Sequence, residues 1–425
     1  MSQANSMDVP SEKDYAKLIT IGILHMAQFF PAAFAGVALP FIFREEGLPI
    51  EMFWVLALPA VPRWLKWLIA MVVDNYGSAR IGFRKSWIIP CTLIGTVCYA
   101  ALAWIPPTVA ALYAIVSILV FKSFVMAAQD TAVDGFAAES MTDAERPVGT
   151  SIIVFLSMVA QIFGAGAVAI VEQFGWSATM LAASLLLLVA ALPAILRAEP
   201  PPPIESLERR KRGERPSILK TLRRPESLWT LPFLFGFGFC GNAVTSMMGP
   251  FFSDKGLSLT QFGTLAVVCF VTGSALGAAV TPWLIRRFGM KLTALIGLSV
   301  LPFEGIAYYA VAAMDGLPTM PILMALMAAI FFGNSIYIFV VSNSRFRWTS
   351  KEQAGTDYSA QSSIWNFGQW AAGSAAGFVV GAVGWSYFFP IAATLTLGFG
   401  LFYVLSFDRV ESMVLAREAE ESVPA

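Results

Sequence analysis

Histidine, cysteine and charged residues are all scarce in this 425-residue chain. It has one histidine and four cysteines, and only 13% of its residues are charged. The cysteines lie inside apolar runs without the paired spacing of a metal or redox site, so we interpret them as buried packing thiols. We therefore expect no metal site and no cofactor. No Walker loop is present, which argues against an ATP-driven pump, and no arrangement of side chains indicates an enzyme.

Hydrophobic residues dominate instead. They make up 57% of the chain, and the mean hydropathy is +0.68, well above that of ordinary soluble domains. Basic and acidic residues number 28 each, so no net charge favours nucleic acid as a partner. The first fifteen residues lack the basic-then-apolar order of a cleaved signal peptide, so the first apolar helix is expected to stay in place. The composition predicts an integral membrane protein.

Twelve apolar runs are long enough to span a bilayer, which takes about 20 residues per helix. They lie at 16–43, 52–73, 86–105, 108–138, 148–171, 177–196, 228–252, 260–284, 292–313, 319–342, 357–382 and 387–406. A polar segment rich in proline and arginine separates the sixth run from the seventh. We predict a tail at 1–15, a six-helix bundle at 16–196, a linker at 197–227, a second six-helix bundle at 228–406 and a tail at 407–425.

The basic residues predict the orientation. They cluster in the linker, from Arg209 to Arg224, and in the loop after the second run, at Arg80, Arg84 and Lys85, whereas the loops on the other side are short or acidic. Basic loops stay on the cytoplasmic side. We therefore expect a bacterial inner-membrane protein whose linker and both termini are cytoplasmic.

The two halves repeat a short pattern. "TDAERPVGT", from Thr142, follows the fourth run, and "TSKEQAGT", from Thr349, follows the tenth. Each has Thr-x-x-Glu followed by Gly-Thr and opens the next helix with a capping pattern. Two parallel six-helix repeats build the major facilitator fold. The sequence thus predicts an all-α membrane protein with that fold, made of twelve transmembrane helices in two six-helix bundles.

Ionisable side chains inside a membrane cost about 2.5–3.5 kcal/mol each on insertion scales and are functional candidates by default. Arg63, Lys66 and Lys122 would attract an anionic substrate, although Lys66 lies near enough to the membrane edge to reach water. His25, with Gln28 beside it, is either a proton relay or a neutral buried histidine.

Polar and aromatic residues of the C-terminal bundle complete the substrate-binding candidates. They are Asn242, Asn334, Tyr337, Gln361, Trp365, Asn366 and Gln369. Their amides and rings suit a large ligand with both rings and polar groups, and hydrogen bonding between helices is the alternative. Gly373, Gly377 and Gly381 form a stripe of small residues, which predicts close helix packing.

Two aspartates end the fourth run, within "AAQDTAVDGFAAE". Asp130 and Asp134 are one helical turn apart and face one direction. About 20 residues after Thr108 the hydrocarbon core is exhausted, so both should lie at the cytoplasmic mouth. We expect them to pair with Arg146 or with the basic loop after the second helix, closing a gate. Proton coupling by Asp130 is the alternative.

The same segment carries a family resemblance. "AQDTAVDGFAAE" resembles the Gln-Asp-x-x-x-Asp signature of one branch of the major facilitator superfamily, which contains muropeptide permeases, acetyl-coenzyme A transporters and inner-membrane siderophore importers. "RWLKWLIAMVVD" and "EQAGTDYSAQSS" are similar to two further segments of that branch, and "DNYGSARIGFRKS" resembles the conserved loop of the superfamily. The resemblance nominates Lys66, Asp74, Gly82, Arg84, Lys85, Gln129, Asp130, Asp134, Gly355, Thr356 and Asp357. For the loop residues, plain topological charge is the alternative.

The resemblance implies a secondary active transporter that works by alternating access. Because the chain is compact, we expect proton-coupled import of a ferric siderophore into the cytoplasm, by a monomer whose partners are that small molecule, protons and the lipid bilayer. A permease for muropeptides or another amphiphilic anion, and a siderophore or drug exporter of the same fold, are the alternatives.

Overall fold

The computed structural model describes residues 14–78, 80–141, 145–196, 199, 218–349 and 354–421. The N-terminal half contains α1 (Tyr15–Ala33), η1 (Phe34–Ala38), α2 (Leu39–Glu45), η2 (Ile50–Met52), α3 (Phe53–Ala57), η3 (Leu58–Ala60), α4 (Val61–Trp64), α5 (Lys66–Asn75), α6 (Lys85–Leu102), η4 (Val109–Ala111), α7 (Leu112–Ser140), α8 (Arg146–Phe174) and α9 (Trp176–Leu196). The C-terminal half contains α11 (Ile218–Leu222), α12 (Ser227–Asp254), α13 (Leu259–Ala313), α14 (Met320–Trp348) and α15 (Ala354–Glu421). The tail at 1–13 and linker residues 197, 198 and 200–217 lie outside the described residues.

The described helices match the predicted membrane spans. Nine are long and apolar enough to cross a bilayer, or ten if the bent pair Ile50–Trp64 and Lys66–Val73 is one span. Gly289 in α13 and Gly384 in α15 have φ values of 75° and 74° and each breaks its helix in two. Twelve spanning segments result. The helix of the last segment continues to Glu421, beyond the end expected near 406, and Val410 and Val414 remain buried along it.

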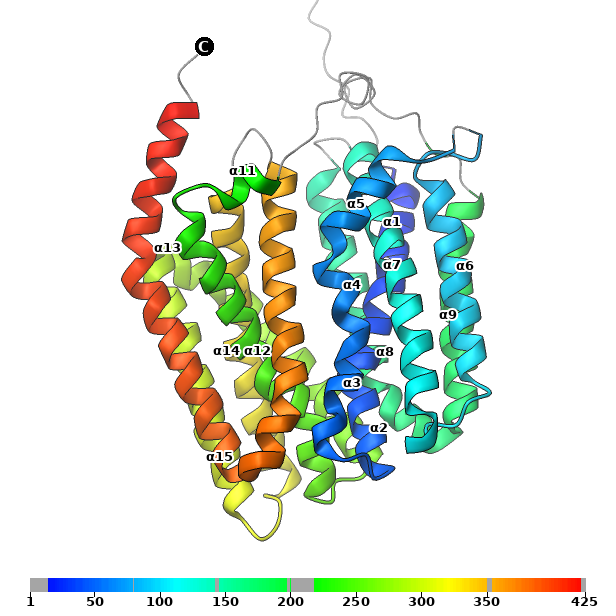
Figure 1. The fold of residues 1–425 in the computed structure, drawn as a ribbon, viewed down its shortest axis with the longest axis vertical. Helices are drawn as coiled ribbons and strands as arrows, with labels where there is room; N and C mark the ends of the chain where they lie inside the picture. The colour runs from blue at the N-terminus through cyan, green and yellow to red at the C-terminus, as the bar shows by residue number, and fades with distance from the viewer. Residues whose placement is uncertain are drawn as a thin grey trace, which may run out of the picture.

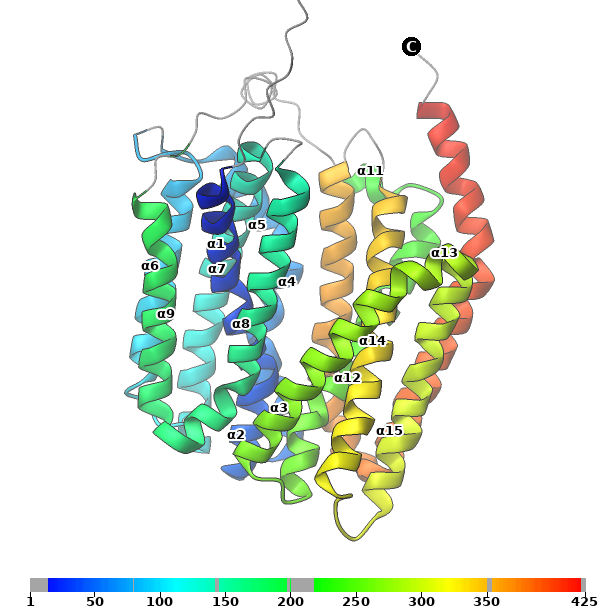
Figure 2. The same cartoon turned by 180° about the vertical axis from the view of Figure 1, so that it is seen from behind.

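The two halves stand side by side as separate helix bundles (Figure 1). In the N-terminal half α1 packs on α8 and α6 packs on α9, and in the C-terminal half α12 packs on α15 and α13 packs on α14. Helix α1 begins, α15 ends and α11 lies at the same end of the molecule, as both views show (Figures 1 and 2). We call this the linker end, and the other the opposite end.

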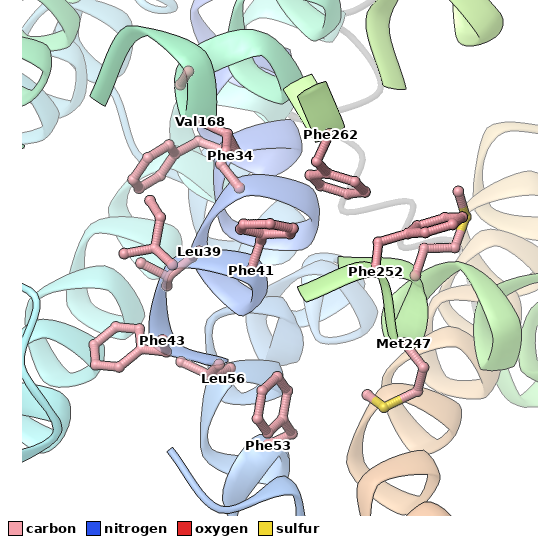
Figure 3. Packing of buried hydrophobic residues seen from close by; sticks show 14 of the residues in the cluster. Phe34, Leu39, Phe41, Phe43, Phe53, Leu56, Val168, Met247, Phe252 and Phe262 are labelled. Carbon is pink, nitrogen blue, oxygen red and sulfur yellow. The ribbon is translucent and has the colours of Figure 1, made fainter. Parts of the chain in front are cut away.

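An apolar cluster joins the halves at the opposite end. Phe41 of α2 stacks on Phe262 of α13 with ring centroids 4.6 Å apart, and Phe252 of α12 lies close to Phe262 as well (Figure 3). Helix α8 also packs on α13, and η2 and α3 pack on α15. The opposite end is therefore the closed end of this structure.

A bend in the second span positions its charged residues. Pro59 and Pro62 each remove a backbone N–H from this helix, and the helix breaks at Leu65 with a 42° change of direction. Lys66 consequently becomes the first residue of α5. The break brings Lys66 to α7, which packs against both α4 and α5.

The tripeptide Gly-Trp-Ser forms a turn in each half. Gly175 separates α8 from α9 with φ 82°, and Gly384 occupies the corresponding place in α15 with φ 74°. Only glycine adopts this backbone readily. Trp176 donates from Nε1 to the carbonyl of Leu102 at 2.8 Å, whereas Trp385 donates to Oδ2 of Asp254 at 2.9 Å. The halves thus share the turn but attach it to different partners.

Candidate functional site

Four ionisable side chains from three spans meet near the linker end. Lys66 Nζ lies 2.6 Å from Oδ2 of Asp130 and 2.7 Å from Oδ2 of Asp134. His25 Nε2 lies 3.2 Å from Oδ1 of Asp134. The side chains of Lys66, Asp130 and Asp134 are 31%, 30% and 51% exposed, so this charge cluster is open to solvent. His25 is buried behind it.

The charge cluster gives the two aspartates partners that were not expected from the sequence. The expected partners were Arg146 or the basic loop after the second helix, and among the described side chains Lys66 and His25 pair with the aspartates. The reason is the bend at Leu65, which turns Lys66 toward α7. The side chains of Arg146 and Asp74 lie outside the described residues.

The hydrogen bonds of His25 identify a proton-sharing pair. Its Nδ1 lies 2.9 Å from the carbonyl oxygen of Ile21, which can only accept, so Nδ1 carries a proton. A neutral imidazole would then present a lone pair to the carboxylate of Asp134. The 3.2 Å contact therefore requires a further proton, either on Nε2 of His25 or on Asp134.

Arg63 adds a second cation to the seam between the halves. It is exposed and lies three residues before Lys66. The negative charge of Asp130 attracts its guanidinium. Asn366 of α15 donates from Nδ2 to the backbone carbonyl of Arg63 at 3.4 Å. Trp64 packs beside it on Phe367 and Trp370. Arg63 thus stands where the bent second span meets the C-terminal half.

Two glutamines hold α1 against α7 next to the charge cluster. Gln28 donates from Nε2 to Oε1 of Gln129 at 2.9 Å, and Gln129 donates to the carbonyl of Leu24 at 3.4 Å. Gln129 is fully buried. These bonds fix the two helices that carry His25, Asp130 and Asp134.

Lys122 stands apart from these residues. It is 3% exposed, and its Nζ lies 5.6 Å from the ring centroid of Tyr99 in α6. No carboxylate of the described residues pairs with it. The structure therefore places Lys122 inside the N-terminal bundle and apart from Lys66, with which the sequence groups it as an attraction for an anionic substrate.

Most candidates of the C-terminal half contact neighbouring helices. Asn242 donates from Nδ2 to the carbonyl of Gln369 at 2.8 Å, and Tyr337 donates from its hydroxyl to the carbonyl of Phe237 at 2.7 Å. Asn334 and the side chain of Gln369 are half-buried. Trp365 is buried beside Phe237 and Tyr337. Gln361 is buried, and its Oε1 has no hydrogen-bond partner.

The linker end contains ion pairs within each half. Arg84 donates from Nη2 to Oε1 of Glu139 at 2.7 Å, and Lys17 pairs with Glu145 at 2.7 Å. In the C-terminal half Asp357, fully buried, accepts from Thr221 and pairs with Arg224 of the segment before α12. The side chains of Gly355 and Thr356 lie outside the described residues. The ion pairs of Arg84 and Asp357 thus hold the ends of neighbouring helices together within each half.

The opposite end holds a polar closure that the sequence analysis missed. Arg44 Nε and Nη2 lie 2.6 and 2.9 Å from the two carboxylate oxygens of Asp254, across the seam. Trp385 also donates to Asp254, and Glu172 accepts from the backbone N–H of Thr260. Nothing in the sequence near Arg44 or Asp254 announces this pairing, because 210 residues separate them.

Arg345 of α14 is a second residue that sequence reasoning missed. It lies in "SNSRFRW", where two arginines end an apolar run and satisfy the charge rule for topology. In the structure it is 8% exposed, and its guanidinium lies 4.3 Å from the ring centroid of Tyr358.

Among the described residues, no group of histidine, cysteine and carboxylate side chains is arranged to hold a metal ion.

Comparisons with known proteins agree with this architecture. The profile of the Major Facilitator Superfamily matches residues 21–312. The anhydromuropeptide permease of Escherichia coli (strain K12) is 22% identical over 420 residues, covering 93% of this chain and 82% of the permease. Transporter AmpG 4 of Rickettsia conorii is 25% identical over 186 residues, and that match spans 42% of this chain and only 44% of the relative's length.

A solved structure gives the fold independently. A mutant of the peptide transporter POT in complex with alafosfalin superposes with a TM-score of 0.69 over 93% of this chain and 95% of that one, at 14% identity. The predicted major facilitator fold is confirmed, and so is the resemblance to the branch with muropeptide permeases.

Proposed function

Because the chain belongs to the Major Facilitator Superfamily, we propose that it carries an anhydromuropeptide-type solute, a sugar-peptide anion, across the bacterial inner membrane into the cytoplasm. The similarity to the anhydromuropeptide permease over 420 residues carries this proposal. The ferric siderophore expected from the sequence finds no support among these relatives. We therefore adopt the alternative substrate, a muropeptide, in place of the siderophore.

The proposed orientation in the membrane follows from the distribution of charged residues. The linker is rich in arginine and lysine, whereas the loops of the opposite end carry Glu45, Glu46, Glu51 and Glu172. Basic segments remain cytoplasmic, so we assign the linker end to the cytoplasm. The structure then corresponds to a carrier closed toward the outside, with its charge cluster exposed to the cytoplasm.

Charge balance supports coupling to protons. Arg63 and Lys66 together balance Asp130 and Asp134, so closing the linker end of the empty carrier adds no net charge to the groups that are already buried. A proton on the His25–Asp134 pair adds one positive charge, and burying an uncompensated charge is costly. An anionic group of the substrate cancels it. The carrier would therefore close when empty, or when it holds both proton and anion, which is the requirement for symport.

Uptake into right-side-out membrane vesicles tests the proposal. Radiolabelled anhydromuropeptide is supplied with an inward gradient of one pH unit, worth about 1.4 kcal/mol per proton and hence up to about tenfold accumulation. Asp134→Asn should abolish this accumulation but retain exchange of labelled for unlabelled substrate. Asp408→Asn is the matched control, since Asp408 pairs with Lys291 at the surface and is 76% exposed.

Two results would contradict the proposal. Gradient-driven accumulation by Asp134→Asn at the wild-type level would exclude the His25–Asp134 pair as the coupling site. Accumulation of a ferric siderophore, with none of the muropeptide, would overturn the substrate and restore the first expectation from the sequence.

A further inference from the structure

Arg345 is a buried cation in the C-terminal half. It is 8% exposed, and no carboxylate of the described residues forms an ion pair with it. Its guanidinium lies 4.3 Å from the ring centroid of Tyr358 and 5.6 Å from that of Trp365. Nη2 donates to Ser362, and Nε has no hydrogen-bond partner. An unpaired buried donor is costly, so a ligand that accepts from Nε would be stabilised here.

The guanidinium lies beside the seam between the halves. Ser362 and Asn366 are four residues apart on α15, so their side chains point only about 40° apart. Asn366 reaches the backbone of Arg63 in the N-terminal half, so this face of α15 points toward that half. Arg345 contacts Ser362, one turn before Asn366, and Tyr358, one turn earlier still. It therefore lies close to the boundary between the halves.

Arg345 also lies at about the depth of the charge cluster. Ser362 is about 6 Å nearer the linker end than Asn366, and Lys66 is about 4.5 Å nearer the linker end than Arg63. Since Asn366 and Arg63 are at the same level, the contact of Arg345 with Ser362 lies roughly opposite Lys66. A substrate of moderate size could touch both halves at this level.

Gln361, on the same helix as Tyr358 and Trp365, supplies an acceptor without a partner among the described residues. It is 3% exposed, its Oε1 has no hydrogen-bond partner, and it lies one helical turn before Trp365. A carboxylate suits the free N–H of a guanidinium, and an amide N–H suits the free oxygen of Gln361. A peptide's C-terminal residue carries both groups, one bond away from its Cα on either side.

We propose that Arg345 and Gln361, with the rings of Tyr358 and Trp365, form a subsite for the terminal carboxylate and adjacent amide N–H of an acylated amino acid or peptide. The inference rests on the proposed function, because it names the part of the sugar-peptide anion that the C-terminal half binds. The two rings lie 4.3 and 5.6 Å from the guanidinium carbon, and the carboxylate would bind its free N–H group.

Equilibrium binding to the purified full-length protein tests the subsite. Two probes are used, an anhydromuropeptide and a plain N-acetyl dipeptide, each with a free C-terminal carboxylate and with that carboxylate amidated. The wild type should bind the free acid about 10- to 100-fold more tightly than the amide, as expected for a charge-assisted hydrogen bond. Arg345→Gln should bring this ratio close to 1, and Arg345→Lys should restore part of it.

Arg347→Gln is the matched control. Arg347 lies two residues further along α14 and pairs with Glu411 through Nε at 3.0 Å and Nη2 at 2.9 Å. Its removal takes the same charge from the same helix end but leaves Arg345 in place. The ratio between free acid and amide should therefore stay at the wild-type value, which separates the subsite from a general loss of positive charge.

The two probes distinguish failure of the subsite from failure of the proposed function. If the muropeptide binds and Arg345→Gln keeps the wild-type ratio, the subsite is overturned and the proposed function stands. If only the dipeptide binds, with a ratio that depends on Arg345, the subsite stands and the muropeptide is excluded. If the wild type binds neither free acid, both are overturned.

Discussion

Replacing Gly377 by alanine should open the opposite end of the carrier. Gly377 lies on α15 where this helix meets η2 of the N-terminal half, and an added Cβ would overlap the backbone carbonyl oxygen of Ile50. A backbone atom cannot move aside as the end of a flexible side chain can. Relief of this overlap requires α15 and η2 to separate, and these elements belong to different halves.

The size of the effect follows from the cost of overpacking, which is typically about 1–3 kcal/mol. This cost applies only to the state in which the opposite end is closed, so the equilibrium should shift toward the open state by about 5- to 150-fold. Gly373→Ala is the matched control on the same stripe. Its Cβ would meet Asn242 Nδ2 at 3.4 Å and Ala57 Cβ at 3.6 Å, which are ordinary contacts. Both variants gain the same helix propensity, about 1 kcal/mol.

Spin labels on exposed loops of the opposite end provide the assay. Labels at Glu46 and Asp315, in the two halves, are introduced after replacement of the four buried native cysteines by serine. The distance distribution of Gly377→Ala should move to longer values, and that of Gly373→Ala should match the parent. Identical distributions for both variants would refute the reasoning that this glycine sets how closely the halves approach.

Two further predictions concern single charges. Asp254→Asn breaks the bidentate pair with Arg44, in which the side chains of Arg44 and Asp254 are 24% and 26% exposed, so it should favour opening of the opposite end by only about 1 kcal/mol, or roughly fivefold; an unchanged label distance would contradict this. Lys122→Met removes a buried cation that lies beside the Tyr99 ring and pairs with no carboxylate of the described residues, and it should raise the free energy of unfolding by about 1–2 kcal/mol. A lower unfolding temperature in detergent would show that Lys122 has a stabilising partner.

The sequence predicted the spans well because hydropathy and length suffice to locate a membrane helix. Segment 52–73 shows the limit of that signal. Its prolines were visible, but the angle between α4 and α5 depends on packing against α7, and that angle decides that Lys66 meets Asp130 and Asp134. The sequence therefore supplied the members of the charge cluster without their pairing.

Helix geometry explains why Lys122 does not join the charge cluster. Eight residues separate it from Asp130, and at 3.6 residues per turn the two side chains point about 80° apart. Asp130 faces α5, while Lys122 faces α6. Arg345 was not recognised as a candidate, for a different reason. The preference for basic residues at cytoplasmic helix ends fully explains its position in the sequence, and only the contacts with Tyr358 and Trp365 in the structure reveal that it is buried.

The Gly-Trp-Ser turns bear on how the chain enters the membrane. Gly175 and Gly384 each reverse the chain at the opposite end through one residue, so almost no polar loop separates the two helices they join. Each pair of helices is thus a helical hairpin whose turn is a single glycine. Insertion of such a hairpin as a unit moves scarcely any hydrophilic backbone through the bilayer, and lengthening either turn with charged residues should slow biogenesis before it affects transport.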